Sequence, residues 1–290
     1  MEPVNQLLQL AKAKHVSDVY FMPKGDQLEI SFRQATGIEQ IQLVPSDMGQ
    51  RWVNYLKFQA GMNVAEHRRV QAGAYQDTKL GLFLRLSSVA NYQGQESLVV
   101  RLITEVPPIA QQDLPLFAHL RQLLANRGLL TLSGPTGSGK TTLLYQLAQS
   151  LVPEQMVMTI EDPVEIYAPT FLQLQVNPRA DMTYATLVKA ALRHRPDCLI
   201  IGEIRDRETA QIACEAAISG HIVMATVHAR HPLDVPLRLT SLGVESALVS
   251  AAVMATAAVS LVFRPTVHAQ VDLWQWEKGV ATHDQSIIPA

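Results

Sequence analysis

The chain has 290 residues, of which 48% are apolar and 17% are charged, so it is able to bury a sizeable core and extensive disorder is excluded. Its net charge of −2 argues against a strongly basic surface that binds nucleic acid. The two cysteines, Cys198 and Cys214, are too few for a structural zinc site, which needs four ligands. We therefore expect two buried thiols in a reducing compartment and no zinc.

The first 104 residues predict a small α+β domain. Residues 2–14 carry apolar side chains at helical spacing. Five short strand-like runs follow, from "DVYFMP" to "SLVVRLI", with Gly, Asn and Asp turn signals between them. Among these runs, residues 45–62 predict a helix with Ser46 or Asp47 as its N-cap. We expect the strands to form an antiparallel sheet.

Residues 105–115 predict a linker, because they contain three prolines and show little periodicity. From 116 to 290 the pattern changes to strands that alternate with helices, starting with "GLLTLSG" and "GKTTLLYQLAQSLV". This alternation predicts an α/β domain whose parallel sheet is covered by helices on both faces. Near its end, "QVDLWQWEKGV" predicts a late strand and a turn.

Residues 246–263, "SALVSAAVMATAAVSLVF", are uncharged and long enough to span a bilayer. They are rich in Ala, Ser and Thr and poor in the residues that favour insertion. We therefore expect a helix packed inside the protein or at a subunit contact, with a membrane span as the minority interpretation. The N-terminus lacks the basic start and apolar core of a signal peptide.

The strongest motif is "GPTGSGKT", which fits the phosphate-loop pattern G-x-x-x-x-G-K-[ST] between an apolar strand and a helical pattern. Backbone N–H groups of such a loop cradle phosphates, and the helix that follows adds a partial positive charge. We expect Lys140 to reach the β- and γ-phosphates of ATP and the Thr141 hydroxyl to ligate Mg²⁺. The predicted nucleotide-binding residues are Gly134, Pro135, Thr136, Gly137, Ser138, Gly139, Lys140, Thr141 and Thr142.

Two further strands end in carboxylates: "MVMTIED" in Glu161 and Asp162, and "CLIIGE" in Glu203. Ligands of open α/β sheets bind at the carboxyl ends of the strands, so both strands should deliver acids beside the phosphates. One acid would orient the attacking water and another would support the Mg²⁺ shell. Asp206 is expected to cap a helix, and Glu165 to be a solvated loop charge.

Histidines and arginines are weaker candidates. His221 precedes the strand "IVMATV" and His228 follows it, where a histidine could sense the γ-phosphate or bind an acid. Arg68, Arg85 and Arg101 would matter only if the first domain brings them to a nucleotide, as arginine fingers do. On spacing alone, ordinary polar and surface roles are the more frequent ones for all five.

Four motifs in order, "GPTGSGKTT", "TIEDPVE", "LIIGEIRDRETA" and "GHIVMATVHA", resemble those of the secretion ATPase superfamily, the motors of type II secretion, type IV pili and competence pseudopili. The stretches "SDVYFMP" and "EHRRVQAG" are similar to motifs in the first domain of that family. The resemblance thus covers nearly the whole chain. It implies a hexameric ATPase with a PAS-like N-terminal domain (1–104), a linker (105–115) and a RecA-like ATPase domain (116–290).

The resemblance also implies site roles, carried over position by position. Glu161 would be the catalytic glutamate that positions water, and Glu203 the glutamate on the Mg²⁺ side. His228 and His221 would form the histidine box, and Arg85 and Arg101 would respond to the γ-phosphate. Arg205 has no assigned role.

The sequence departs from its relatives in ways that favour one branch. It lacks the tetracysteine zinc motif of many extension motors and the typical ending of retraction motors, and so looks most like the competence-type ATPase of Gram-positive bacteria. That resemblance implies a cytoplasmic hexamer at the inner face of the membrane, working on a polytopic platform protein. The alternatives are a pilus extension or retraction motor, an ATP-binding scaffold without turnover, and a nucleic-acid translocase, although direct nucleic-acid binding is not expected.

Overall fold

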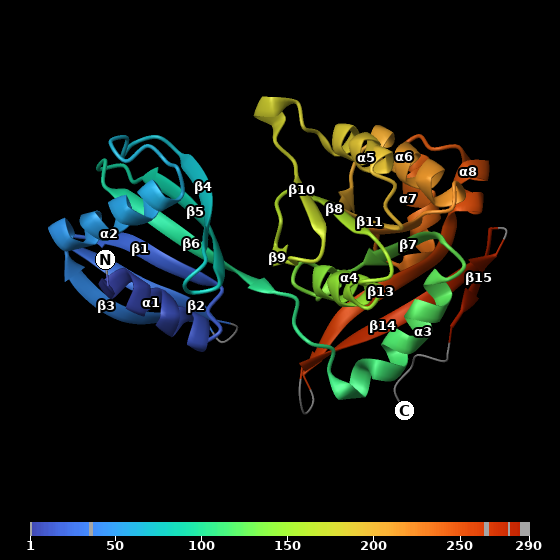
Figure 1. The fold of residues 1–290 in the computed structure, drawn as a ribbon, viewed down its shortest axis with the longest axis horizontal. Coiled ribbons are helices and arrows are strands. Elements are labelled where there is room, and N and C mark those ends of the chain that lie inside the picture. The colour runs from blue at the N-terminus through green and yellow to red at the C-terminus, as the bar shows by residue number, and fades with distance from the viewer. Residues whose placement is uncertain (1, 35–36, 264–266, 278, 285–290) are drawn as a thin grey trace. The chain divides into compact units, whose positions relative to one another are not determined.

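The computed structural model describes residues 2–34, 37–263, 267–277 and 279–284, and the chain divides into two compact units, Met1–Thr104 and Glu105–Ala290 (Figure 1). The elements of the first unit are α1 (Glu2–Ala13), β1 (Asp18–Lys24), β2 (Gln27–Gln34), β3 (Gly37–Pro45), α2 (Ser46–Gln59), β4 (Gln71–Asp77), β5 (Leu82–Ala90) and β6 (Glu96–Glu105).

The strands of the first unit pair antiparallel in the order β3-β2-β1-β6-β5-β4, as the turn-rich alternating sequence predicts. Apolar side chains of α1 and α2, such as Leu8 and Leu56, pack with those of the strands in one core. The predicted α2 cap is wrong, because the helix begins at Ser46 itself: Pro45 occupies the cap position and makes no side-chain cap bond. Strand β4 was not predicted, since "QAGAYQD" is poor in β-branched residues.

The second unit contains more elements. They are α3 (Leu114–Leu124), β7 (Gly128–Ser133), α4 (Lys140–Gln149), β8 (Val157–Glu161), β9 (Ile166–Tyr167), β10 (Leu172–Gln175), α5 (Tyr184–Arg193), β11 (Cys198–Ile204), α6 (Arg207–Ile218), β12 (Ile222–Val227), α7 (Val235–Ser241), α8 (Ser246–Ala252), β13 (Val253–Phe263), β14 (Val267–Glu277) and β15 (Val280–His283). Helix α3 begins at Leu114, so the predicted linker contains the start of a helix.

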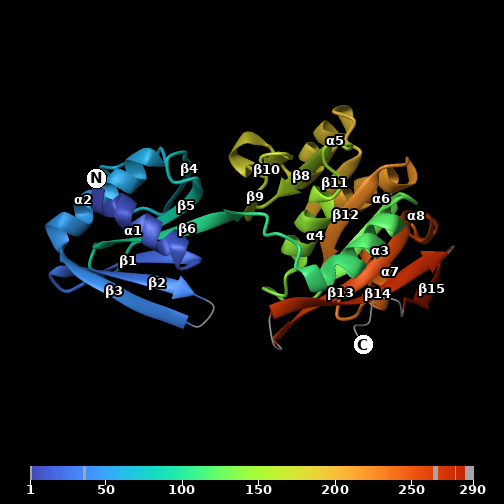
Figure 2. The same ribbon diagram turned by 60° about the horizontal axis from the view of Figure 1, so that its bottom comes forward.

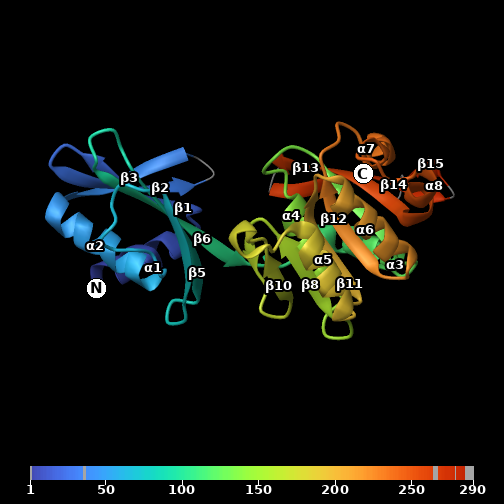
Figure 3. The same cartoon turned by 90° about the horizontal axis from the view of Figure 1, so that it is seen from above.

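The sheet of the second unit has the order β10-β8-β11-β12-β7-β13-β14-β15. Strands β10 to β13 along this order run parallel, as predicted, whereas β14 and β15 add an antiparallel edge. Helices cover both faces: α3 and α4 share one core with the sheet (Figure 2), and α5 and α6 belong to the core on the opposite face (Figure 3). The α/β class predicted from the alternation is therefore confirmed.

The prediction of one helix over residues 246–263 is wrong. The segment is a short helix, α8, that ends at Ala252, followed by strand β13. Strand β13 lies between β7 and β14, and Ala255 and Ala257 are fully buried in the core to which α3 and α4 also contribute. Pairing with β7 on one side and β14 on the other overrides the helical propensity of the alanines. Within the described residues, no helix is long and apolar enough to cross a bilayer.

Helix α6 begins as predicted. The side chain of Asp206 accepts a hydrogen bond from the backbone N–H of Thr209 at 2.8 Å, which satisfies one of the free donors at the helix start. Both cysteines, Cys198 on β11 and Cys214 on α6, are buried free thiols, as the composition predicts.

Candidate nucleotide-binding site

The loop Gly134–Gly139 joins the buried strand β7 to helix α4 and has the backbone of a phosphate loop. Gly134 and Gly139 take positive φ angles of 139° and 90°, which residues with a Cβ rarely adopt. A Cβ at Gly134 would also lie 2.5 Å from the carbonyl oxygen of Val259 on β13. The glycines at both ends of this loop are thus required by backbone conformation, and one of them also by space.

Two polar side chains, those of Ser138 in the loop and Lys140 at the start of α4, are placed to meet an anion. Lys140 Nζ donates to the carbonyl oxygens of Gly134 and Pro135 at 2.9 and 2.8 Å, so the amine is held over the loop. Burial lowers the pKa of Lys140, while the nearby charges of Glu165 and Glu203 oppose that shift. The buried Ser138 hydroxyl has no hydrogen-bond partner among the described residues.

The loop opens into a cavity of about 890 Å³ at the carboxyl end of the parallel strands. Its walls come from the phosphate loop and α4, from the ends of β8, β11 and β12, and from the segment before α3. The polar residues that line it include Lys140, Thr141, Tyr145, Glu161, Glu165, Glu203 and His228. The structure therefore gathers most of the predicted site residues in one cavity, as strand order predicts.

Glu203, near the end of β11, is held by an arginine and a histidine. The Arg205 guanidinium donates to Oε1, and His228 Nε2 lies 3.3 Å from Oε2. The hydrogen bond from Arg205 is the main reason that the pKa of Glu203 lies below its usual range. Arg205, to which the sequence assigned no role, therefore keeps Glu203 ionised at the edge of the cavity.

Glu161, the last residue of β8, is only 3% exposed. Its Oε1 accepts hydrogen bonds from the hydroxyls of Tyr145 on α4 and Thr159 on β8, the latter at 2.7 Å. Burial raises the pKa of this carboxyl, and the hydrogen bonds counteract only part of that rise. Its donors are thus hydroxyls and a backbone N–H, and no cation pairs with it among the described residues.

Glu165 is an exposed loop residue, as the sequence predicts, but it also has contacts at the site. Its carboxylate is exposed but accepts a 3.3 Å hydrogen bond from the Thr141 hydroxyl, at the start of α4. It also lines the cavity and acts on the pKa of Lys140. The signal that could have identified it is its spacing, four residues after Glu161 across a short proline turn at the strand end.

Of the predicted histidines and arginines, His221 does not line this cavity, and Arg85 and Arg101 belong to the first unit. His221 precedes β12, at the opposite end of that strand from His228, and its Nδ1 lies 3.0 Å from the carbonyl oxygen of Ala216. Arg85 and Arg101 are direct cross-strand partners on β5 and β6 of the first unit. Arg101 Nε donates to buried Asp18 at 2.8 Å.

Comparison with known proteins decides the family. Residues 1–286 match the family described as type II/IV secretion system protein. The chain belongs to this family. It is 44% identical over 253 residues to the competence protein ComGA of Streptococcus pneumoniae, a match that covers 84% of this chain and 78% of that protein.

Two further relatives extend the comparison. The type IV pilus assembly ATPase PilB of Thermus thermophilus is 33% identical over 279 residues, covering 93% of this chain and 31% of that protein. The X-ray structure of the Legionella pneumophila ATPase DotB superposes with a TM-score of 0.74 at 22% identity, covering 94% of this chain and 80% of that one, and so shows the shared fold. The predicted membership of the secretion ATPase superfamily, and with it ATP hydrolysis, is confirmed.

Proposed function

We propose that this protein is the ATPase of a competence pseudopilus, a hexamer at the cytoplasmic face of the membrane that acts on a platform protein during DNA uptake. The high similarity to a competence protein supports the competence role. The observation that carries the ATPase chemistry is one cavity that holds the phosphate loop and the carboxylates of two strand ends. We further propose that the first unit is PAS-like and the second RecA-like, with the domain limits 1–104 and 116–290.

The residues present fit ATP and a divalent cation. The buried, unpartnered Ser138 hydroxyl and the Lys140 amine are donors suited to phosphate oxygens, and Thr141 and Glu203 offer the hard oxygen ligands that Mg²⁺ prefers. When bound, Mg²⁺ would neutralise charge that develops on the β- and γ-phosphates. Before it binds, Arg205 and His228 hold Glu203 in its ionised, oriented form.

The sequence predicts that Glu161 orients the attacking water. The contacts of the acids in "TIEDPVE" favour another residue for this role. We propose Glu165 for this role, because its exposed carboxylate reaches Thr141, next to Lys140. Glu161 is buried and engaged by Tyr145 and Thr159. A carboxylate that orients water needs access to water and to the γ-phosphate, and Glu165 satisfies the first condition better.

Arg85 and Arg101 remain proposed sensors of the γ-phosphate, by resemblance, and we propose that His228 senses it through Glu203. His221 lacks a contact that would support a similar role. The alternative function is a pilus extension or retraction motor, which the similarity to PilB keeps open. Deleting the gene separates the two: loss of DNA uptake with surface pili unchanged supports the competence role, and loss of pili, or pili that no longer retract, contradicts it.

Phosphate release by the purified protein tests the site. Lys140→Ala should abolish Mg²⁺-dependent turnover, whereas Lys189→Ala, which removes an exposed lysine paired with Glu208, should not. Glu165→Gln should lower kcat by about 10²-fold or more while ATP binding persists, as expected for a group that acts in the transition state.

Glu161→Gln in the same assay should retain measurable turnover. If instead Glu161→Gln abolishes turnover and Glu165→Gln stays near wild type, the water-orienting acid is Glu161, as the sequence argument has it. Sedimentation with ATP tests the hexamer directly, since a monomer under all nucleotide conditions would contradict it.

A further inference from the structure

Helix α4 contacts the segment 161–165 at two successive turns. Thr141 and Tyr145 are four residues apart and therefore lie on the same face of the helix. Thr141 donates to the side chain of Glu165, and Tyr145 donates to that of Glu161. The helix that starts at the phosphate loop is thus joined to both ends of the acidic turn.

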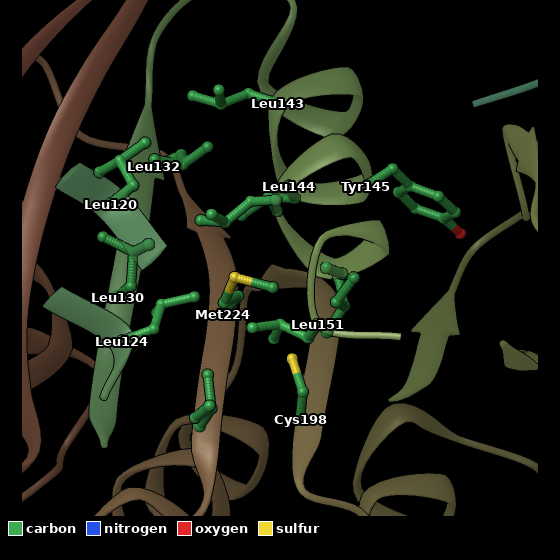
Figure 4. Packing of buried hydrophobic residues seen from close by; sticks show 14 of the residues in the cluster. Leu120, Leu124, Leu130, Leu132, Leu143, Leu144, Tyr145, Leu151, Cys198 and Met224 are labelled. Atoms are coloured by element: carbon green, nitrogen blue, oxygen red, sulfur yellow. The ribbon is translucent and has the colours of Figure 1, made fainter. Parts of the chain in front are cut away.

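Tyr145 is fully buried, and its ring packs in the apolar core with Phe171 at a centroid distance of 5.5 Å. Figure 4 shows its hydroxyl directed away from the leucines of that core. A phenylalanine would fill the same space, so packing alone does not explain the hydroxyl. A buried hydroxyl needs hydrogen-bond partners, and this one has two. It donates to Glu161 and accepts from Gln173 Nε2 at 2.8 Å.

Gln173, on β10, extends these bonds to the chain that follows the acidic turn. Its Nε2 also donates to the carbonyl oxygen of Ile166 at 2.7 Å, and its Oε1 accepts from the backbone N–H of Ala168 at 2.9 Å. The hydroxyl of Tyr145 therefore lies where α4, β8 and β10 meet. One partner, Gln173, thus binds the backbone that follows Glu165, and the other, Glu161, binds the backbone N–H of Glu165 itself.

The carboxylate of Glu161 completes the arrangement. Besides the hydroxyls of Tyr145 and Thr159, it accepts a hydrogen bond from the backbone N–H of Glu165. Its own carbonyl oxygen accepts from Val176 at 2.9 Å. Glu161 thus binds the backbone of the residue whose side chain reaches Thr141, and its own position depends on Tyr145.

We propose that Tyr145 is a positioning residue: through Glu161 and Gln173 it fixes the turn that places the Glu165 carboxylate beside Thr141. This inference rests on the proposed role of Glu165 in ATP hydrolysis. Tyr145 should affect the chemical step and not nucleotide binding, because Lys140 donates to the phosphate loop and the Tyr145 hydroxyl contacts neither Lys140 nor Thr141.

Tyr145→Phe tests the inference in steady-state kinetics. We expect kcat to fall about tenfold, the effect of one lost hydrogen bond in the barrier, with KM for ATP changed by less than about twofold. The matched control is Tyr75→Phe on β4 of the first unit, whose buried hydroxyl has no partner among the described residues and which should leave kcat unchanged. An unchanged kcat in Tyr145→Phe, or a loss confined to KM, overturns the proposal.

A double-mutant cycle separates positioning from a general loss of stability. In a Glu161→Gln background, Tyr145→Phe should lower kcat by less than it does in the wild type, because one of the two partners through which the tyrosine acts is already changed. Additive losses would mean that the tyrosine acts independently of Glu161, and they would overturn the proposal.

Amide hydrogen exchange of the nucleotide-free protein provides a readout that does not depend on turnover. Tyr145→Phe should accelerate exchange in residues 162–168 and leave that of β7 and the N-terminal half of α4 unchanged. Equal exchange in the wild type and the variant overturns the inference. Failure of the proposed function is seen separately, as phosphate release that survives Lys140→Ala.

Discussion

Among the described residues, each unit buries one glutamate almost completely, and the two glutamates have opposite electrostatic surroundings. Glu96 in the first unit is 5% exposed and Glu161 in the second is 3% exposed. The first has a buried cation as a direct partner, and the second has hydroxyl and backbone donors. The same residue type at similar burial thus has two different electrostatic settings.

Glu96 is the centre of an ion-pair network. Lys57 Nζ, which is fully buried, lies 2.5 Å from its Oε1, and His67 Nδ1 lies 2.8 Å from its Oε2. Burial alone would raise the pKa of Glu96, but the hydrogen bonds from His67 and Lys57 and the lysine charge together bring it below the usual value. Lys57 also donates to the carbonyl oxygen of Glu66, so the network ties α2 to the loop before β4.

Glu161 lacks such compensation, and it lines the cavity of the candidate site. An unpaired buried carboxylate lowers stability at neutral pH, because desolvation penalises its charged form. The comparison indicates that Glu96 serves the fold of its unit, whereas the placement of Glu161 serves the nucleotide site. Local loss of stability at functional residues is a general feature of enzymes.

The largest expected effect concerns the first unit, in which Lys57 compensates the charge of Glu96. Lys57→Met leaves Glu96 buried without its cation and should lower the free energy of unfolding of the first unit by roughly 3–5 kcal/mol. Urea denaturation, followed by Trp52 fluorescence in a Trp274→Phe/Trp276→Phe background, measures this unit by itself. The control is Lys14→Met, which breaks the exposed Lys14–Glu39 pair and should cost at most about 1 kcal/mol. Equal losses of unfolding free energy in Lys57→Met and Lys14→Met would show that the buried pair is no more important for stability than an exposed one.

A smaller effect, of opposite sign in the two units, is expected with pH. The lowered pKa of Glu96 means that its contribution to stability is present above the unfolded pKa and is lost as pH falls through the folded value. The raised pKa of Glu161 means the reverse: its contribution is present below the unfolded pKa and is lost as pH rises through the folded value.

The destabilisation caused by Glu96→Gln should therefore grow from acid to neutral pH, and that caused by Glu161→Gln should shrink. Denaturation of both variants and the wild type across this range gives the two slopes. Slopes of the same sign would show that one of the two carboxylates is in a different state from the one described here.

Much of the candidate site could be predicted from the sequence because it is local. The phosphate loop is fixed by glycines at set spacing, and the strand–helix alternation places Glu203 and His228 at the same sheet edge. The Asp206 cap was likewise predictable from its place before a helical pattern.

What could not be predicted depends on tertiary contacts. Strand β8 is buried along its whole length, so alternation says nothing about which face each side chain meets. Only the structure shows that Glu161 meets Tyr145 while Glu165 meets Thr141. The alanine-rich β13 was missed for a similar reason: its strand conformation comes from pairing with the next strand, β14, and with β7, which is distant in sequence.

The two buried glutamates, Glu96 and Glu161, differ in charge compensation. The most direct test of this difference is a ¹³C NMR titration of the side-chain carboxyls in nucleotide-free, glutamate-labelled protein. Signals are assigned by their loss in Glu96→Gln and Glu161→Gln. The account predicts a midpoint for Glu161 above the ordinary glutamate value and a midpoint for Glu96 below it. A Glu161 midpoint at or below that of Glu96 would contradict it.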